Sequence, residues 1–128
     1  HVRSRRQRQM CIRDSPKVVD DQRGRLTFAT EIARLIRTLV ETRPSFGVYN
    51  LTSEGEVVTW ADVARRVFEL AGHDPARVTG VSTEQYFASA TSPVAPRPLN
   101  SVLDLTRVHG IGFRPRAGDD LLREYLSP

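Results

Sequence analysis

Apolar residues recur along the chain with the spacing of a helix face in one segment and with strand-like alternation in others. One example of the first pattern places five apolar side chains at i, i+3, i+4, i+7 and i+8, which predicts one apolar helix face: Ile32, Leu35, Ile36, Leu39 and Val40. Pro44 ends this helix, and the hydroxyl of Thr27 or Thr30 is expected to cap its start.

A second helix is predicted to begin after Thr59. The segment Thr59–Asp62 resembles a capping box in which the shorter Asp stands where Glu is usual, and Gly72 suits the position just after the helix. Between them the apolar residues keep helical spacing: Trp60, Val63, Ala64, Val67, Phe68 and Ala71. We therefore expect Trp60 to be a core residue.

The remaining helical patterns are shorter. Residues 84–88 and 101–108 predict short helices, the second with Leu103 and Leu105 as packing residues. A last helix is expected at Asp119–Leu126, after the breaks at Gly110, Gly112 and Pro115, with a buried face formed by Leu121, Leu122 and Tyr125.

Three apolar segments predict strands: 16–22, followed by a turn at Arg23–Gly24, then 47–52 and 77–81. Residues 89–98 hold three prolines among small residues and predict a surface loop. Since strands alternate with helices, the fold class is α/β, and 128 residues allow one domain with a modest core.

The charge of the chain is concentrated at its N-terminus. Five of the 19 Lys+Arg residues and one of the 15 Asp+Glu residues fall in residues 1–15, which gives this segment a net charge of +4. Residues 16–128 hold 14 residues of each sign and have no net charge. The folded part therefore has no excess positive field for nucleic acid, and we expect no nucleic-acid partner.

Residues 1–15 have three interpretations. Five Arg in 15 residues fit an arm that contacts nucleic acid or anionic lipid, and the scarcity of apolar residues fits a plain disordered tail. The run from Arg6 to Ser15 also resembles translated sequencing-adaptor sequence, which is the interpretation that we favour. We expect the fold to begin at Pro16.

The residues offer no self-sufficient catalytic or metal site. Cys11 is the single cysteine, which excludes an intramolecular disulfide and is compatible with a reducing cytoplasm. The three histidines lack metal-ligand spacing, His109 being interpreted as a helix-end residue, and no apolar run approaches the ~20 residues of a membrane span. Gly110-Ile111-Gly112-Phe113-Arg114-Pro115 has proline in place of the third glycine of a dinucleotide loop, and Lys17, the only lysine, cannot form a Tyr-x-x-x-Lys pair.

What remains is a candidate binding surface in two loops. The stretch Arg97–Asp104 places a guanidinium and short polar groups at a bend where a helix could start, which suits an anion. The alternative, a surface arginine that fixes its own loop, is equally supported by the residues. Asp21 and Gln22, before Gly24, either bond a sugar or base or form an Asx-type turn that satisfies its own backbone.

Five motifs, taken in order, resemble the C-terminal part of dTDP-4-dehydrorhamnose reductase and its sugar-nucleotide-binding relatives among the extended short-chain dehydrogenases. They are Val19-Asp20-Asp21-Gln22-Arg23-Gly24-Arg25-Leu26-Thr27, Gly47-Val48-Tyr49-Asn50-Leu51, Thr59-Trp60, Arg97-Pro98-Leu99-Asn100-Ser101-Val102-Leu103-Asp104 and Gly112-Phe113-Arg114-Pro115. The resemblance covers nearly all of residues 18–126. Leu26 departs from the family's proline, which predicts a less rigid loop.

The resemblance implies an NADP-binding, Rossmann-like α/β protein of which residues 16–128 are the substrate-binding fragment, without the N-terminal dinucleotide-binding half. The full-length protein would use NADPH to reduce the 4-keto group of dTDP-4-dehydro-L-rhamnose. It would act in the cytoplasm without a membrane partner, and it could form a homodimer. It implies a dTDP-sugar site formed by Arg97, Ser101, Asp21, Gln22, Gly24 and Thr27.

Three expectations follow for the fragment itself. Alone it would be inactive, because the cofactor and the Tyr-x-x-x-Lys pair belong to the missing half. It would also be poorly stable, because it would expose the apolar patch that once faced that half. The competing hypothesis is a non-catalytic nucleotide-sugar-binding or regulatory subunit of the same fold.

Overall fold

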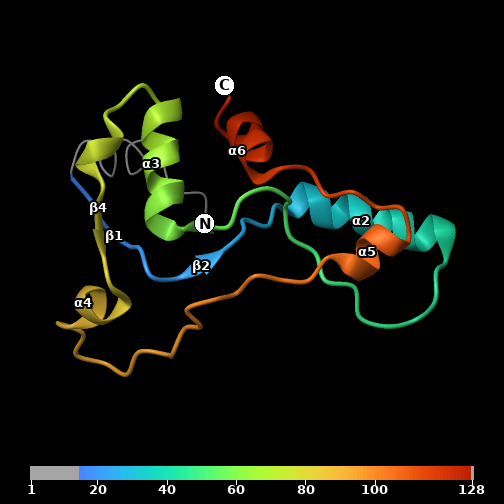
Figure 1. Ribbon diagram of the computed structural model, residues 1–128, viewed down its shortest axis with the longest axis horizontal. Coiled ribbons are helices and arrows are strands. Elements are labelled where there is room, and N and C mark those ends of the chain that lie inside the picture. The colour runs from blue at the N-terminus through green and yellow to red at the C-terminus, as the bar shows by residue number, and fades with distance from the viewer. Residues whose placement is uncertain (1–14, 128) are drawn as a thin grey trace. The chain divides into compact units, whose positions relative to one another are not determined.

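The computed structural model describes residues 15–127, and their contacts divide them into two compact units (Figure 1). Unit 1 contains residues 15–23 and 58–100, and unit 2 contains residues 24–57 and 101–127. The predictions for residues 1–14 lie outside the described residues. Strand β2 (Arg23–Gly24) stands where the chain passes from the first unit to the second, so the turn predicted there is wrong.

Unit 1 is built on a parallel strand pair. Strand β1 (Lys17–Val19) pairs with β4 (Thr79–Val81), so that Val18 lies opposite Gly80. Helix α3 (Trp60–Leu70), which follows β3 (Val58–Thr59), packs against β1 and against the 3-10 helix η1 (Pro75–Arg77). Helix α4 (Thr83–Phe87) also contacts β1. The buried apolar residues of this unit are Val19, Ala61, Phe68 and Val78.

The predicted capping box of α3 is confirmed. The Asp62 backbone N–H donates to the Thr59 hydroxyl, and the Thr59 backbone N–H donates to the Asp62 carboxylate at 2.9 Å. Gly72 follows the C-cap with a φ of +76°, in the left-handed region that glycine accepts without strain. The core position predicted for Trp60 is wrong, because this first helical residue is 54% exposed while Ala61 and Phe68 face the interior.

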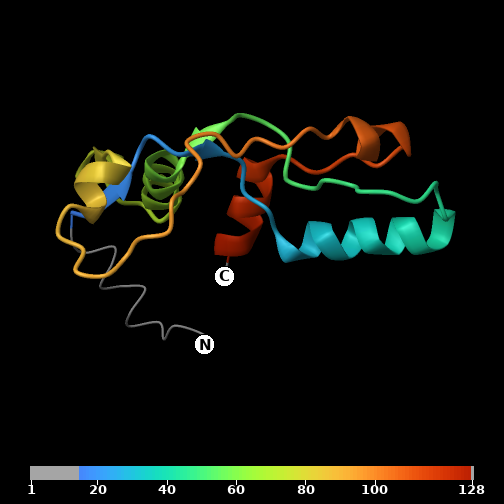
Figure 2. The same ribbon diagram turned by 90° about the horizontal axis from the view of Figure 1, so that it is seen from below.

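Unit 2 contains helices α2 (Ala29–Thr42), α5 (Thr106–Gly110) and α6 (Gly118–Leu126). Its core cluster joins one residue of α2 to the α5 region: Leu35, Leu105, Val108 and Phe113. The segment that follows α2 returns toward α5, and its Tyr49 and Leu51 pack against this cluster (Figure 2).

The start of α2 differs from the prediction. Its N-cap is Phe28, and no side chain caps it. Thr30 is already helical, and Thr27 is held elsewhere, since its hydroxyl donates to the Thr52 hydroxyl at 3.1 Å. The carbonyl of Leu26 accepts bonds from the backbone N–H of Ser53 and from the hydroxyls of Thr52 and Ser53. These bonds fix the backbone at Leu26, where a less rigid loop is expected from the sequence.

The strand predicted at 47–52 is absent from the described structure. These residues belong to no helix or strand, and among residues 15–127 they make no backbone–backbone hydrogen bond. Alternation predicts a strand only where a neighbouring strand supplies the ladder, and none is present here. Gly47 is required at its position, because its φ is +147° and an added Cβ would overlap the Arg107 guanidinium.

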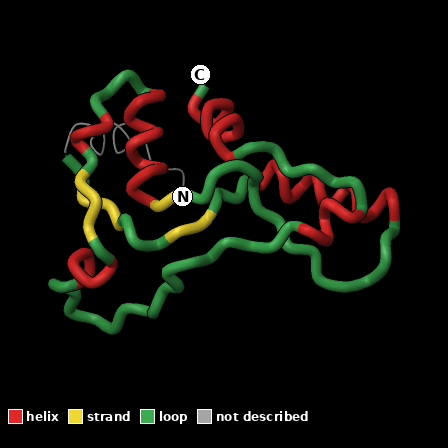
Figure 3. The backbone as a smooth tube through the Cα atoms, in the orientation of Figure 1, coloured by secondary structure: helices red, strands yellow, loops and turns green. Residues whose placement is uncertain are grey.

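The stretch from 88 to 105 runs without a helix (Figure 3). The helix predicted at 101–108 begins at Thr106 instead, because the Asp104 carboxylate accepts the Thr106 backbone N–H at 2.7 Å and fixes a turn there. Leu105 is buried as predicted, whereas Leu103 is exposed. In α6, Leu121 and Leu122 are buried as predicted, but Tyr125 is 71% exposed and only its ring edge approaches Phe28.

Candidate functional site

Asp21 and Gln22 both bond to Thr83 in unit 1. One Asp21 carboxylate oxygen accepts from the Thr83 hydroxyl at 2.6 Å, and the other accepts from the Thr83 backbone N–H at 2.9 Å. Gln22 donates its amide N–H to the same hydroxyl at 3.0 Å. The hydrogen bonds from the Thr83 side chain and backbone lower the pKa of Asp21. The loop is therefore ordered by a partner 62 residues further along the chain, which sequence reasoning missed.

The two predicted loops meet in both units. In unit 1 the backbone N–H of Arg23 donates to the Leu99 carbonyl at 2.8 Å, and Arg23 forms a parallel bridge with Asn100. In unit 2, Gly24 lies so close to Ser101 that an added Cβ would stand 2.6 Å from the Ser101 hydroxyl oxygen. A side chain at position 24 would therefore require the Ser101 hydroxyl to move away.

Arg97 lies in the same stretch and is exposed. Within residues 15–127 its guanidinium makes no hydrogen bond, ion pair or ring contact. The alternative in which Arg97 fixes its own loop therefore has no supporting contact in the described structure. The expected helix start beside it is wrong, since α5 begins nine residues later at Thr106 and is too short to offer an anion site.

Thr27, the last predicted site residue, is exposed and belongs to unit 2. Its hydroxyl bonds Thr52, and the buried pair Thr52–Ser53 holds the Arg25–Leu26 backbone in turn. Thr52 and Ser53 were not singled out from the sequence. The sequence feature that could have pointed to these two residues is their position directly after the alternating segment 47–51.

A pocket of about 380 Å³ opens in unit 2 beside the segments that follow Gly24 and Ser101. It is lined by Arg25, Glu54, Gly55, Leu103, Leu105 and His109. Arg25 donates its Nε–H to the Gly55 carbonyl at 2.9 Å, and Glu54 pairs with His109. The two leucines give the pocket an apolar wall, and the charged groups give it polar partners, a combination suited to a small polar organic ligand.

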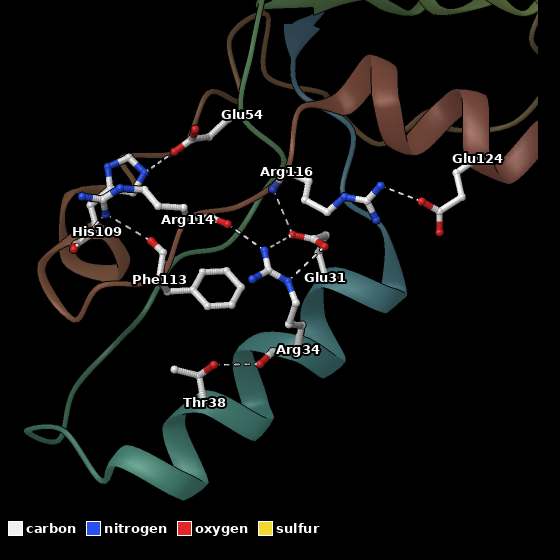
Figure 4. A network of polar contacts seen from close by, with 9 residues as sticks. All are labelled: Glu31, Arg34, Thr38, Glu54, His109, Phe113, Arg114, Arg116 and Glu124. Carbon is white, nitrogen blue, oxygen red and sulfur yellow. Dashed lines mark hydrogen bonds and ion pairs between the residues drawn. The ribbon is translucent and has the colours of Figure 1, made fainter.

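Unit 2 also contains a network of charged groups (Figure 4). Glu31 is buried and accepts two bonds from Arg34, the shorter at 2.7 Å, and one from the Arg116 backbone N–H at 3.0 Å. Arg34 also donates to the Arg114 carbonyl and lies 4.2 Å from the Phe113 ring centroid. The Arg34 hydrogen bond is the main cause that lowers the pKa of Glu31, against the opposing effect of burial.

Two searches of residues 15–127 gave negative results. In this part of the chain, no group of three or more His, Cys, Asp or Glu side chains is arranged to hold a metal ion. The helices found there are also too short or too polar to cross a membrane.

Comparisons with known proteins point to one family. The family model described as RmlD substrate binding domain matches residues 5–128. The spore coat polysaccharide biosynthesis protein SpsK of Bacillus subtilis is 33% identical over 111 residues, which cover 87% of this chain and 36% of that protein. The dTDP-4-dehydrorhamnose reductase of Streptomyces griseus is 36% identical over 107 residues, covering 80% of this chain and 33% of the reductase.

Solved structures agree. A dTDP-4-dehydrorhamnose reductase from Clostridium acetobutylicum superposes with a TM-score of 0.78 at 28% identity, over 92% of this chain and 40% of its own. The Bacillus anthracis reductase in complex with NADP gives a TM-score of 0.75 at 25% identity, over 92% and 39%. The chain thus spans about a third of these curated relatives and two fifths of these solved structures.

Proposed function

Because the chain belongs to the RmlD substrate binding domain family, we propose that it is the substrate-binding part of an NADPH-dependent dTDP-4-dehydrorhamnose reductase. The reaction proposed for the full-length protein is reduction of the 4-keto group of dTDP-4-dehydro-L-rhamnose to give dTDP-L-rhamnose. Relatives with reductase names and a structure that contains NADP support this assignment.

The meeting of the two motif loops is the observation that carries the proposal. The Arg23–Asn100 bridge and the Gly24–Ser101 contact join the two stretches that most resemble the family's substrate side. They lie far apart in the sequence, and nothing in the spacing of either loop alone requires them to touch. A shared ligand is a physical reason for the pairing, since one molecule can then be held from both loops.

We propose Arg97 and Ser101 as the substrate contacts, with the loop of Asp21, Gln22, Gly24 and Thr27 lining the same site. Because the Arg97 guanidinium has no partner within residues 15–127, it offers its whole fork of donors to a diphosphate. The bonds of Asp21 and Gln22 to Thr83 hold their loop in place. The unit 2 pocket, lined by Arg25 and Leu103 among others, belongs to the same proposal.

Segment 110–115 does not fit the dinucleotide loop that binds NADPH. Gly110 is the last residue of helix α5 and Gly112 follows that helix rather than a strand, and buried Pro115 stands where such a loop needs its third glycine. We therefore assign the cofactor to the remaining part of the full-length protein and derive no step through it. On this proposal the chain alone binds the sugar nucleotide and performs no reduction.

Calorimetric titration of the chain with dTDP-L-rhamnose tests the site. We expect Arg97→Ala to raise the dissociation constant roughly 10- to 150-fold, as loss of a hydrogen bond between charged groups implies. The matched control is Arg123→Ala, which removes an exposed arginine that bonds only Asp119 in α6. An unchanged dissociation constant for Arg97→Ala, with a lower melting temperature, would assign Arg97 to loop structure instead.

A chimera distinguishes the reductase from a non-catalytic binding subunit. In it, residues 16–128 replace the matched segment of the Streptomyces griseus reductase, which supplies the remaining two thirds of the protein. Oxidation of NADPH in the presence of dTDP-4-dehydro-L-rhamnose supports the reductase, whereas binding without turnover supports the subunit. The cytoplasmic location and a homodimeric full-length protein stay part of the proposal, to be checked by cell fractionation and analytical ultracentrifugation.

A further inference from the structure

The side chain of Gln22 is half-buried in unit 1 and is held from one side only. Its NH2 group donates to the Thr83 hydroxyl at 3.0 Å. Within residues 15–127 this side chain makes no other hydrogen bond. In the same part of the chain, no buried side-chain nitrogen or oxygen of a buried or half-buried residue lacks a partner. The carbonyl oxygen of Gln22, which has none, is therefore open to solvent.

The donors and acceptors around Thr83 decide which end of the Gln22 amide points inward. Hydrogen bonds from the Thr83 side chain and backbone lower the pKa of Asp21, so its carboxylate is ionised at neutral pH and only accepts hydrogen bonds. The one hydroxyl proton of Thr83 therefore goes to the Asp21 oxygen 2.6 Å away. Only lone pairs of that hydroxyl remain for Gln22. Gln22 must turn its NH2 group inward and its carbonyl outward.

The outward carbonyl belongs to the loop that meets the stretch of Arg97. Gln22 directly precedes β2, whose Arg23 donates its backbone N–H to the Leu99 carbonyl at 2.8 Å and bridges Asn100. All of these residues belong to unit 1. An acceptor of fixed direction thus stands beside the residues proposed to bind the sugar nucleotide.

We propose that the Gln22 carbonyl accepts a hydrogen bond from a hydroxyl of the hexose, and that Thr83 and Asp21 are the positioning residues that set its direction. The diphosphate carries no donor at neutral pH, and the hexose is the part of a sugar nucleotide richest in hydroxyl groups. This inference rests on the proposed function and deepens it, because it names the atom that meets the sugar. A ligand group that only accepts hydrogen bonds cannot use this oxygen.

Calorimetric titration of the chain with two ligands, dTDP-L-rhamnose and dTDP, tests the contact. Thr83→Val keeps the branched shape of the side chain and removes the hydroxyl that orients Gln22. The dissociation constant of dTDP-L-rhamnose should rise about 3- to 10-fold, as loss of one neutral hydrogen bond implies. That of dTDP, which lacks the hexose, should change less than about 2-fold. Equal losses for the two ligands, or no loss for either, would overturn the proposal.

Two further substitutions separate the hydroxyl from its surroundings. Thr79→Val is the matched control, because Thr79 is an exposed residue of the same unit whose hydroxyl makes no hydrogen bond within residues 15–127. It should leave both dissociation constants within about 2-fold of the wild type. Thr83→Ser restores the hydroxyl and should recover the wild-type affinity for dTDP-L-rhamnose. Absence of this recovery would overturn the positioning role of the hydroxyl.

Asp21→Asn reverses the direction of the hydrogen bonds without removing them. The new amide must turn its oxygen to the Thr83 backbone N–H and its NH2 group to the Thr83 hydroxyl, because the opposite placement sets two donors against each other. Thr83 then donates to Gln22, whose amide turns its carbonyl inward. We expect the same selective loss of affinity for dTDP-L-rhamnose.

The control for this variant is Asp20→Asn, which removes the same charge from the exposed preceding residue and should leave both dissociation constants within about 2-fold. Equal effects of the two substitutions would overturn the proposal. Because Asp21→Asn keeps the hydrogen bonds of the loop, it also decides the case if Thr83→Val does not fold.

Nuclear magnetic resonance observes the amide orientation without a ligand. In the wild type Thr83 holds one of the two Gln22 side-chain amide protons, which should exchange with water more slowly than the other. In Asp21→Asn neither proton is held, and the two rates should be alike. Equal rates in the wild type would overturn the proposed orientation. If neither ligand binds the wild-type chain, the proposed function fails and the hexose contact with it, whereas the exchange rates still decide the orientation.

Discussion

A single carboxylate, that of Glu31, ties two segments of unit 2 together. It accepts hydrogen bonds from Arg34 in its own helix and from the Arg116 backbone, and Arg34 continues to the Arg114 carbonyl (Figure 4). A buried carboxylate is tolerated only when its oxygens are paired in this way. Glu31 therefore fixes the 114–116 segment against α2.

Glu31→Gln should lower the free energy of unfolding by about 2–3 kcal/mol. The neutral amide loses the hydrogen bonds between charged groups, and its NH2 group faces N–H donors with which it cannot bond. Chemical denaturation measures this value. The control Glu41→Gln breaks the exposed pair with Arg37 and should cost at most about 0.5 kcal/mol. Similar losses for the two variants would show that the Glu31 network contributes no more than a surface ion pair.

The same residue predicts the acid limit of stability. Because the Arg34 hydrogen bond lowers the pKa of Glu31 in the folded state, the carboxylate stabilises the fold above its unfolded pKa of about 4.3. This contribution is lost as the pH falls through the lower, folded pKa. Denaturation from pH 7 to pH 3 should show the difference between wild type and Glu31→Gln shrinking below about pH 4.3, and a constant difference would contradict the assignment.

At the scale of elements, sequence patterns predicted correctly those features that depend on contacts between residues close in the sequence. The α3 capping box, the helix over residues 29–42, the β1 strand and the position of Gly72 could all be identified from the sequence, because each depends on residues within one turn or one strand. The apolar face predicted for that helix is buried only in part, since Leu35 is buried but Ile32, Ile36 and Val40 are exposed. The same signals could not show that Thr83 would bond Asp21, or that Ser101 would touch Gly24. Those contacts join residues 60 or more positions apart, and no periodicity encodes them.

Three of the wrong predictions have physical causes in context. Segment 47–52 has a strand sequence without a strand beside it, Trp60 has helical spacing but stands at the exposed first position of α3, and Asp104 stops the helix expected at 101. Val48 and Trp60 are apolar residues that stay exposed in the described chain. On the proposed function such errors are expected, because the pattern would include contacts with the rest of the full-length protein.

Thr59→Ala tests whether α3 depends on its capping box. Removal of the hydroxyl leaves the Asp62 backbone N–H without its 3.2 Å acceptor and should lower the free energy of unfolding by about 1 kcal/mol. Ser92→Ala, in the exposed loop 89–98, is the control and should change it by less than about 0.5 kcal/mol. Thermal or chemical denaturation followed by circular dichroism gives both values. If Thr59→Ala does not change the free energy of unfolding, the packing of Phe68 rather than the cap determines the stability of α3.

At the scale of the whole molecule, each unit is assembled from two separate stretches of chain. Unit 2 needs residues 24–57 and residues 101–127, which are joined through Leu35, Leu105, Val108 and Phe113 and through the bond between Glu31 and Arg116. The connection between these stretches passes through the exposed residues 88–100. The chain that connects the two stretches is therefore separate from the contacts that pack them together. Cutting the connection tests whether these contacts alone hold unit 2 together.

Limited digestion with elastase should cut first between residues 88 and 96, because this stretch is exposed throughout, has no helix or strand, and offers Ala, Ser and Val as cleavage positions. The two products should separate on a denaturing gel but elute together in gel filtration, since residues 101–127 keep their buried contacts with residues 24–57. Glu31→Gln should weaken this association after cleavage, whereas Glu41→Gln should not. Release of the C-terminal product from the wild-type chain would mean that the unit 2 core alone does not hold the two stretches together, and that its cohesion depends on the intact loop.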